Sequence, residues 1–155
     1  MEDQLVDFLR SRREQTPNPE INWQAKKDVW IRSVNTLYEL IQAMLRDSIA
    51  SKDVMVRTFD VQITEDFIGT YAIPVLELSV GRERVEFRPK GLTIIGAAGR
   101  VDIRGESDTV TLVKDTANAD SGWTIILQRV PHLKRVQLDR ESLKYALERV
   151  MLPLP

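Results

Sequence analysis

The spacing of apolar residues changes twice along this 155-residue chain. Apolar side chains recur every three or four residues over the first third of the chain, then every second residue, and finally at helical spacing again. The first spacing is typical of one helix face, and the second is typical of a strand with one buried face. The pattern therefore predicts helices, then a sheet, then a further helix.

The first helical segment is short. Its apolar face and one arginine follow helical spacing: Leu5, Phe8, Leu9 and Arg12. Pro17 and Pro19 then prevent the helix from continuing. We expect an N-terminal helix and a proline-containing break within residues 1–19.

The second helical segment, residues 22–51, is the longest periodic stretch. Its main apolar stripe contains Trp23, Trp30, Val34, Leu37, Ile41 and Met44. A helix of this length would span about 40 Å, which exceeds the width of a small sheet, so one end should project or pack on another subunit. Trp23 and Trp30 lie two turns apart on one face, and we consider two roles for them, core packing and contact with another chain.

Residues 53–137 alternate as antiparallel strands. Gly81 and Arg82 form a two-residue turn, which fixes the register of the strands on either side. In this register Leu76 lies opposite Phe87, Leu78 opposite Val85, and Glu77 opposite Glu86. A second hairpin sets Val101 opposite Leu112 and Ile103 opposite Val110.

Residues 139–152 form the last helix, with Asp139 as its N-cap and Pro153 beyond its end. Together these segments predict a single α+β domain over residues 1–155. It has two N-terminal helices, a curved antiparallel sheet of about five to seven strands in a meander or partial barrel, and a C-terminal helix packed on the sheet.

Composition narrows the possible chemistry. Apolar residues make up 43% and charged residues 29%, with a net charge of −1, which is typical of a soluble globular protein. The chain contains no cysteine, so disulfides and thiolate metal sites are excluded. His132 is the single histidine, so a two-histidine metal site within one subunit is excluded. We expect a cytoplasmic bacterial protein with no metal, no cofactor and no membrane partner.

Segment 94–103, IIGAAGRVDI, is the one stretch that resembles a motif. It lacks the lysine and hydroxyl of a P-loop and has only part of the dinucleotide-binding fingerprint. It is superficially similar to the RNA-binding loop of KH modules, but that loop joins two helices, whereas residues 100–104 alternate like a strand. Asp102 also stands where a KH loop has an aliphatic residue. We favour Gly96 and Gly99 as positions where the sheet bends.

Carboxylates on the predicted strands suggest metal-dependent chemistry as one alternative. Nucleases of the restriction-enzyme fold place an acid on one strand and Glu-x-Lys on the next. Here Asp60 or Glu77 would supply the first acid, and Glu86 and Arg88 stand in the second position. Arginine cannot exchange a proton near neutral pH. The weak candidates for catalysis are Glu77, Glu86 and Asp102, and the other interpretation is a ladder of Glu and Arg across strands.

Basic residues suggest a second alternative. Residues 82–104 contain six basic and three acidic side chains, a local charge of +3. Candidate contacts to a ligand or to nucleic-acid phosphates are Arg84, Arg88, Lys90, Arg100 and Arg104, with Arg82 beside them.

The predicted function follows by elimination. We expect a non-catalytic cytoplasmic module for binding or assembly, which forms a homo-oligomer or binds another protein, with Trp23 and Trp30 as candidate interface residues. The alternatives are a nucleic-acid-binding protein and a metal-dependent phosphodiesterase.

Overall fold

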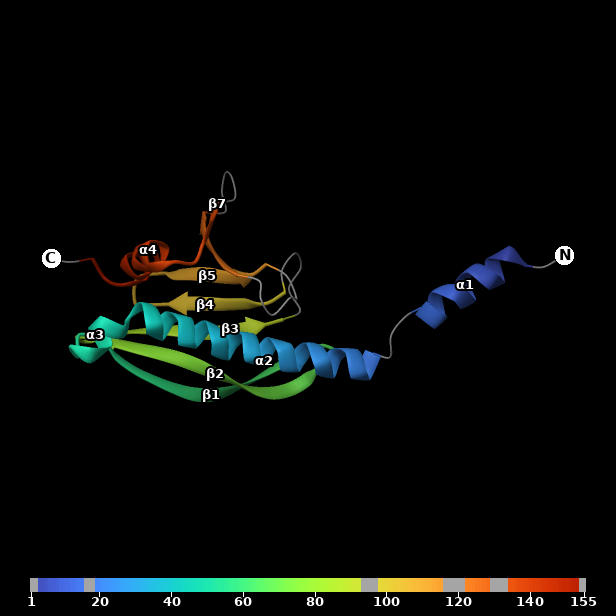
Figure 1. Ribbon diagram of the computed structural model, residues 1–155, viewed down its shortest axis with the longest axis horizontal. Coiled ribbons are helices and arrows are strands. Elements are labelled where there is room, and N and C mark those ends of the chain that lie inside the picture. Colours follow the sequence, from blue (N-terminus) through green and yellow to red (C-terminus); the bar gives the residue numbers. More distant parts are fainter. Residues whose placement is uncertain (1–2, 16–18, 93–97, 116–121, 129–133, 154–155) are drawn as a thin grey trace.

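The computed structural model of the chain describes residues 3–15, 19–92, 98–115, 122–128 and 134–153 (Figure 1). Within them the helices are α1 (Gln4–Gln15), α2 (Pro19–Met44), α3 (Arg46–Ala50) and α4 (Arg140–Val150). The strands are β1 (Met55–Glu65), β2 (Gly69–Val80), β3 (Glu83–Gly91), β4 (Arg100–Arg104), β5 (Thr109–Lys114), β6 (Trp123–Gln128) and β7 (Lys134–Gln137).

The seven strands form one open antiparallel sheet in sequence order, with β1 and β7 at its edges. Helices α2 and α4 cover the same face, because side chains of both, such as Leu37 and Leu143, join one buried cluster with Leu78, Phe87 and Ile103 of the sheet. The predicted α+β class is confirmed, and the sheet is an open meander of seven strands.

Turn chemistry fixes the register of the β2–β3 hairpin as predicted. Leu78 lies opposite Val85, and Glu77 lies opposite Glu86. Gly81 has a φ of 61°, a conformation that side-chain-bearing residues adopt only at a cost. The β4–β5 hairpin also has its predicted register, with the apolar pairs Val101–Leu112 and Ile103–Val110.

Two prolines explain where β2 and β3 separate. These strands pair only as far as Leu76 and Phe87, and two residues further in the same register Pro74 would face Pro89. Neither proline has an N–H to donate to the ladder, so the pairing ends there. Beyond this point β2 remains paired with β1, and β3 remains paired with β4.

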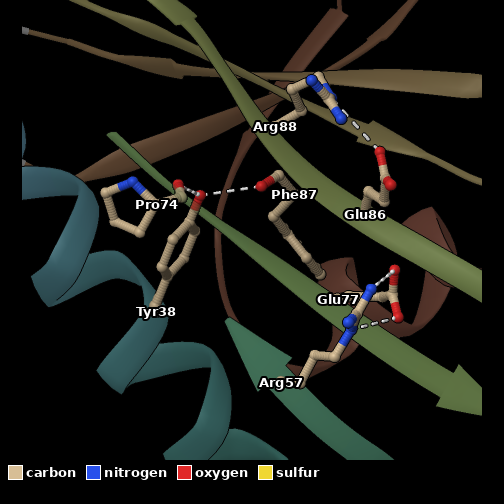
Figure 2. Close-up of polar contacts among 7 residues, drawn as sticks. All are labelled: Tyr38, Arg57, Pro74, Glu77, Glu86, Phe87 and Arg88. Carbon is tan, nitrogen blue, oxygen red and sulfur yellow. Dashed lines mark hydrogen bonds and ion pairs between the residues drawn. The ribbon is translucent and has the colours of Figure 1, made fainter. Parts of the chain in front are cut away.

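The point at which β2 and β3 separate is called the fork below. Tyr38 of α2 forms hydrogen bonds to main-chain carbonyls there (Figure 2). Its hydroxyl oxygen lies 2.7 Å from the carbonyl oxygen of Pro74 and 2.8 Å from that of Phe87. The single hydroxyl proton is shared between these two carbonyl oxygens, one on each of the separating strands. Burial raises the pKa of Tyr38 well above its usual value, so the phenol stays protonated and remains a donor.

The N-terminal half of α2 lies beside the β1–β2 hairpin, which extends beyond the fork (Figure 1). The ring of Trp23 stacks on that of Phe67 in the β1–β2 turn, with centroids 5.6 Å apart. The end of the long helix that was predicted to project is therefore accompanied by this hairpin.

The long helical segment is interrupted once. Residues 22–51 were predicted as one helix, whereas α2 ends at Met44 and α3 begins at Arg46. The interruption is confined to Leu45, because α-type hydrogen bonds still run from Leu45 N–H to Ile41 and from Ile49 N–H to Leu45.

Helix α4 begins at a reciprocal cap. The Ser142 N–H donates to Asp139 Oδ1 at 2.8 Å, and the Asp139 N–H donates to Ser142 Oγ at 2.9 Å. The helix ends at Val150, and Met151 is already extended, two residues before Pro153. None of the helices in the described ranges is long and apolar enough to cross a membrane.

Candidate interaction surfaces

The face of the sheet opposite α2 and α4 carries most of the charged candidates from the sequence. We call it the charged face. Strand alternation places Leu76 and Leu78 in the core and therefore Glu77 on this face. On strands β1–β4 the same alternation places eight charged residues here: Arg57, Glu77, Arg84, Glu86, Arg88, Arg100, Asp102 and Arg104. Arg135 of β7 lies on the same face, opposite Ile126 of β6. Asp60 alternates to the other face of β1, and Lys90 lies at a register shift in β3.

Glu77 is held by an arginine that the sequence analysis missed. Arg57 of β1 lies directly opposite Glu77, and its Nε and Nη2 donate to the two carboxylate oxygens at 3.0 and 3.4 Å (Figure 2). The Glu77 side chain is only 7% exposed, whereas that of Arg57 is 64% exposed. The hydrogen bond to Glu77 raises the pKa of Arg57, and the charge of the same carboxylate adds to this effect.

Asp102 forms a second buried carboxylate site. Arg100 Nε and Nη2 donate to its two oxygens at 2.8 and 3.2 Å. Thr111 of β5, directly opposite Asp102, adds a longer bond at 3.4 Å from its hydroxyl. A buried carboxylate with these donors is satisfied by the sheet itself.

Glu86 lies between a like and an opposite charge in the strand register. Glu77 is its neighbour on β2, and Arg104 is its neighbour on β4. The carboxylate turns to Arg88 on its own strand, whose Nε donates to it at 3.3 Å. Figure 2 shows the two neighbouring glutamates, Glu77 and Glu86, with separate guanidinium partners, an arrangement that offsets their repulsion.

The charged face matches the predicted cross-strand ladder only in part: the Arg57–Glu77 pair joins two strands, whereas Arg88–Glu86 and Arg100–Asp102 are pairs within one strand. Its eight charged residues on β1–β4 are five arginines and three carboxylates, a surplus of 5 − 3 = +2. Arg84 and Arg104 are exposed and form no ion pair within the described ranges. Among the same residues no group of three or more metal-ligating side chains converges.

A second surface lies on the helix side of the molecule. The C-terminal end of α2, α3 and α4 enclose a groove of about 860 Å³, which we call the helix groove. Apolar side chains make up much of it: Met44, Leu45, Leu143, Leu147, Met151 and Leu152. Its charged members are Glu83, Arg140, Glu141, Lys144 and Glu148. The sequence gives no direct signal for this groove, because it arises from the spacing of two helices on the sheet.

Helix α1 presents a third surface. It lies apart from the sheet and the other helices (Figure 1). Leu5, Phe8 and Leu9 are 63%, 54% and 56% exposed. The guanidinium of Arg12 lies over the Phe8 ring, 5.4 Å from its centroid. The apolar face predicted for this segment is therefore present and uncovered.

The two candidate interface tryptophans differ in their surroundings. Trp30 is 2% exposed and packs against Trp123, with ring centroids 6.1 Å apart, so its side chain belongs to the core. Trp23 is half-buried and contacts Phe67 and Lys26. Of the two, only Trp23 borders the surface.

Gly99 has a packing role. A Cβ at this position would overlap the six-membered ring of Trp30. Lys114 N–H donates to the Gly99 carbonyl at 2.9 Å, so this residue continues the β4–β5 ladder. The register shifts in the described part of the sheet lie in β3, between Pro89 and Gly91, and in β6 and β7, between Ile126 and Gln128; the bend expected at Gly96 stays a prediction. Gly96 and His132 lie outside the described residues.

Comparisons of this chain with protein-family models, with curated proteins and with solved structures find no match.

Proposed function

We propose that this chain is a non-catalytic assembly module that self-associates through its helix side, in the cytoplasm of a bacterium. The observation that carries the proposal is the uncovered apolar face of α1 on a chain that also has an open apolar groove. Contiguous exposed apolar surface on a soluble protein is costly in water and marks sites of contact with other molecules.

The charged face supports this assignment indirectly. A cation at Glu77 or Asp102 would have to displace Arg57 or Arg100, each of which contacts both oxygens of its carboxylate. The carboxylates of the metal-dependent alternative thus already have partners within the sheet. We therefore favour assembly over a phosphodiesterase activity.

Mass in solution tests the proposal. Light scattering across micromolar concentrations is expected to give a mass above the 17.8 kDa of one chain. Because the contact is apolar, the mass should persist in high salt. A mass of 17.8 kDa throughout this range contradicts self-association.

Nucleic-acid binding is a second candidate, and one observation favours it. The β1–β4 part of the charged face has a surplus of two positive charges, and its exposed Arg84 and Arg104 form no ion pair within the described part of the chain. Binding of mixed single- and double-stranded nucleic acid should then weaken steeply with salt, and Arg84→Ala with Arg104→Ala should reduce the salt slope by about two. Absence of salt-sensitive binding to any of these pools removes this candidate.

A further inference from the structure

We infer that α1 is an exchanged arm, and that its apolar face docks into the helix groove of a second copy of this chain. The inference rests on the proposed self-association and names its contact surface. Its basis is that the same chain has both a helix whose apolar face is exposed among the described residues and an apolar groove that such a helix could fill. The helix and the groove lie far apart from each other in the fold (Figure 1).

The apolar side chains of α1 have the spacing found in helices that bind in apolar grooves of other proteins. Leu5, Phe8 and Leu9 occupy positions i, i+3 and i+4, and Arg12 follows at i+7. Helix-in-groove complexes use anchors at these four positions. The groove offers Met44 and Met151 beside leucines, and flexible methionine side chains adapt to an inserted helix.

The formal charges of α1 and of the helix groove have opposite signs. Residues 4–15 contain three arginines and two carboxylates, 3 − 2 = +1. The groove contains Glu83, Glu141 and Glu148 against Arg140 and Lys144, 2 − 3 = −1. The basic residues of α1 all lie in its second half, so docking would bring this end near carboxylates of the groove.

Chain length prevents α1 from reaching the groove of its own chain. Met44 lies 25 residues after Pro19 along α2, a distance of about 38 Å. The four steps from Gln15 to Pro19 span at most about 14 Å, and the ten residues from Gln15 to Leu5 span about 15 Å as helix. The greatest reach, about 29 Å, falls short of Met44. The groove that α1 can fill therefore belongs to another copy.

Symmetry favours a closed pair. When two copies lie antiparallel along α2, the N-terminal end of each α2 is beside the groove end of its partner. Each arm then enters the other groove, which gives a two-fold dimer with two equivalent contacts. The expected mass is 2 × 17.8 = 35.6 kDa.

Paired variants of the full chain test the arm and the groove. The test variant of the arm, Leu5→Glu with Phe8→Glu, places two charges on the apolar face of α1. Its control, Gln4→Glu with Ser11→Glu, adds the same charge next to that face. In the groove Leu152→Glu alters a residue that is 50% exposed, and Tyr145→Glu, 44% exposed on α4, is its control outside the groove. Circular dichroism and thermal unfolding verify that each variant folds.

Light scattering should show both test variants as 17.8 kDa monomers where the wild type and both controls are dimers. An equimolar mixture of the two test variants should regain part of the dimer, because one chain retains its groove and the other retains its arm. A dimeric wild type whose test variants stay dimeric contradicts the docking of α1 and leaves self-association standing. A wild type that is monomeric throughout contradicts the proposed function itself.

Discussion

Tyr38 joins helix and sheet through one hydroxyl group. The phenol is buried, and its oxygen lies within 2.8 Å of the main-chain carbonyl oxygens of Pro74 and Phe87, on the two strands that separate at the Pro74–Pro89 fork. A buried acceptor without a donor loses its bond to water and gains nothing in return. This single side chain therefore positions the C-terminal half of α2 over the point where β2 and β3 separate.

Tyr38→Phe removes the hydroxyl and keeps the ring. We expect the free energy of unfolding to fall by about 1–3 kcal/mol, because the carbonyls of Pro74 and Phe87 lose their donor. Urea denaturation measures the change, and Tyr145→Phe on the exposed side of α4 is the matched control. Equal stability of the two variants would show that the fork does not depend on this bond.

Arg100 and Asp102 allow a second test at the scale of the residue. Arg100→Ala would leave the carboxylate of Asp102, 4% exposed, with only the long bond from Thr111, and should cost about 1–3 kcal/mol of stability. Arg149→Ala breaks the exposed pair with Asp108 and should cost less than about 1 kcal/mol. Urea midpoints of both variants check the order, and the reverse order would contradict burial as the cause.

At the scale of elements, turn chemistry decides what the sequence could predict. Gly81 set the β2–β3 register correctly, because few residues other than glycine tolerate its positive φ. The β1–β2 turn carries Phe67 at a φ of 70°, which no propensity would suggest. Because this turn was not predicted, the pairing of Arg57 with Glu77 was not predicted either, although Glu77 was correctly set opposite Glu86.

Gly99 links two elements, β4 and α2, by close approach. Gly99→Ala should destabilise the fold by about 1–3 kcal/mol, because the added Cβ overlaps the buried ring of Trp30. Gly122→Ala is the control, because a Cβ there has its nearest neighbour at 3.6 Å. Thermal unfolding compares them, with Trp fluorescence reporting the displaced ring. An unchanged Gly99→Ala variant would contradict a packing role for this glycine.

At the scale of the whole molecule, the sheet separates two surfaces of different character. The ladder of arginines and carboxylates covers one face, and the helix groove opens on the other. Periodicity along the sequence predicted the elements that build both, but not the separation of α1 from the rest or the gap between α2 and α4, which depend on contacts distant in sequence. Assembly through the helix side leaves the charged face available to solvent.

Cross-linking between copies tests the central claim most directly. The chain has no cysteine, so Ser11→Cys on α1 and Lys144→Cys at the groove rim can be introduced into separate preparations, mixed, and joined with a short bismaleimide. We predict a covalent dimer of the two different chains in high yield, and little product when Thr109→Cys on the charged face replaces Lys144→Cys. Equal yields from the two mixtures, or no dimer from either, would contradict the account.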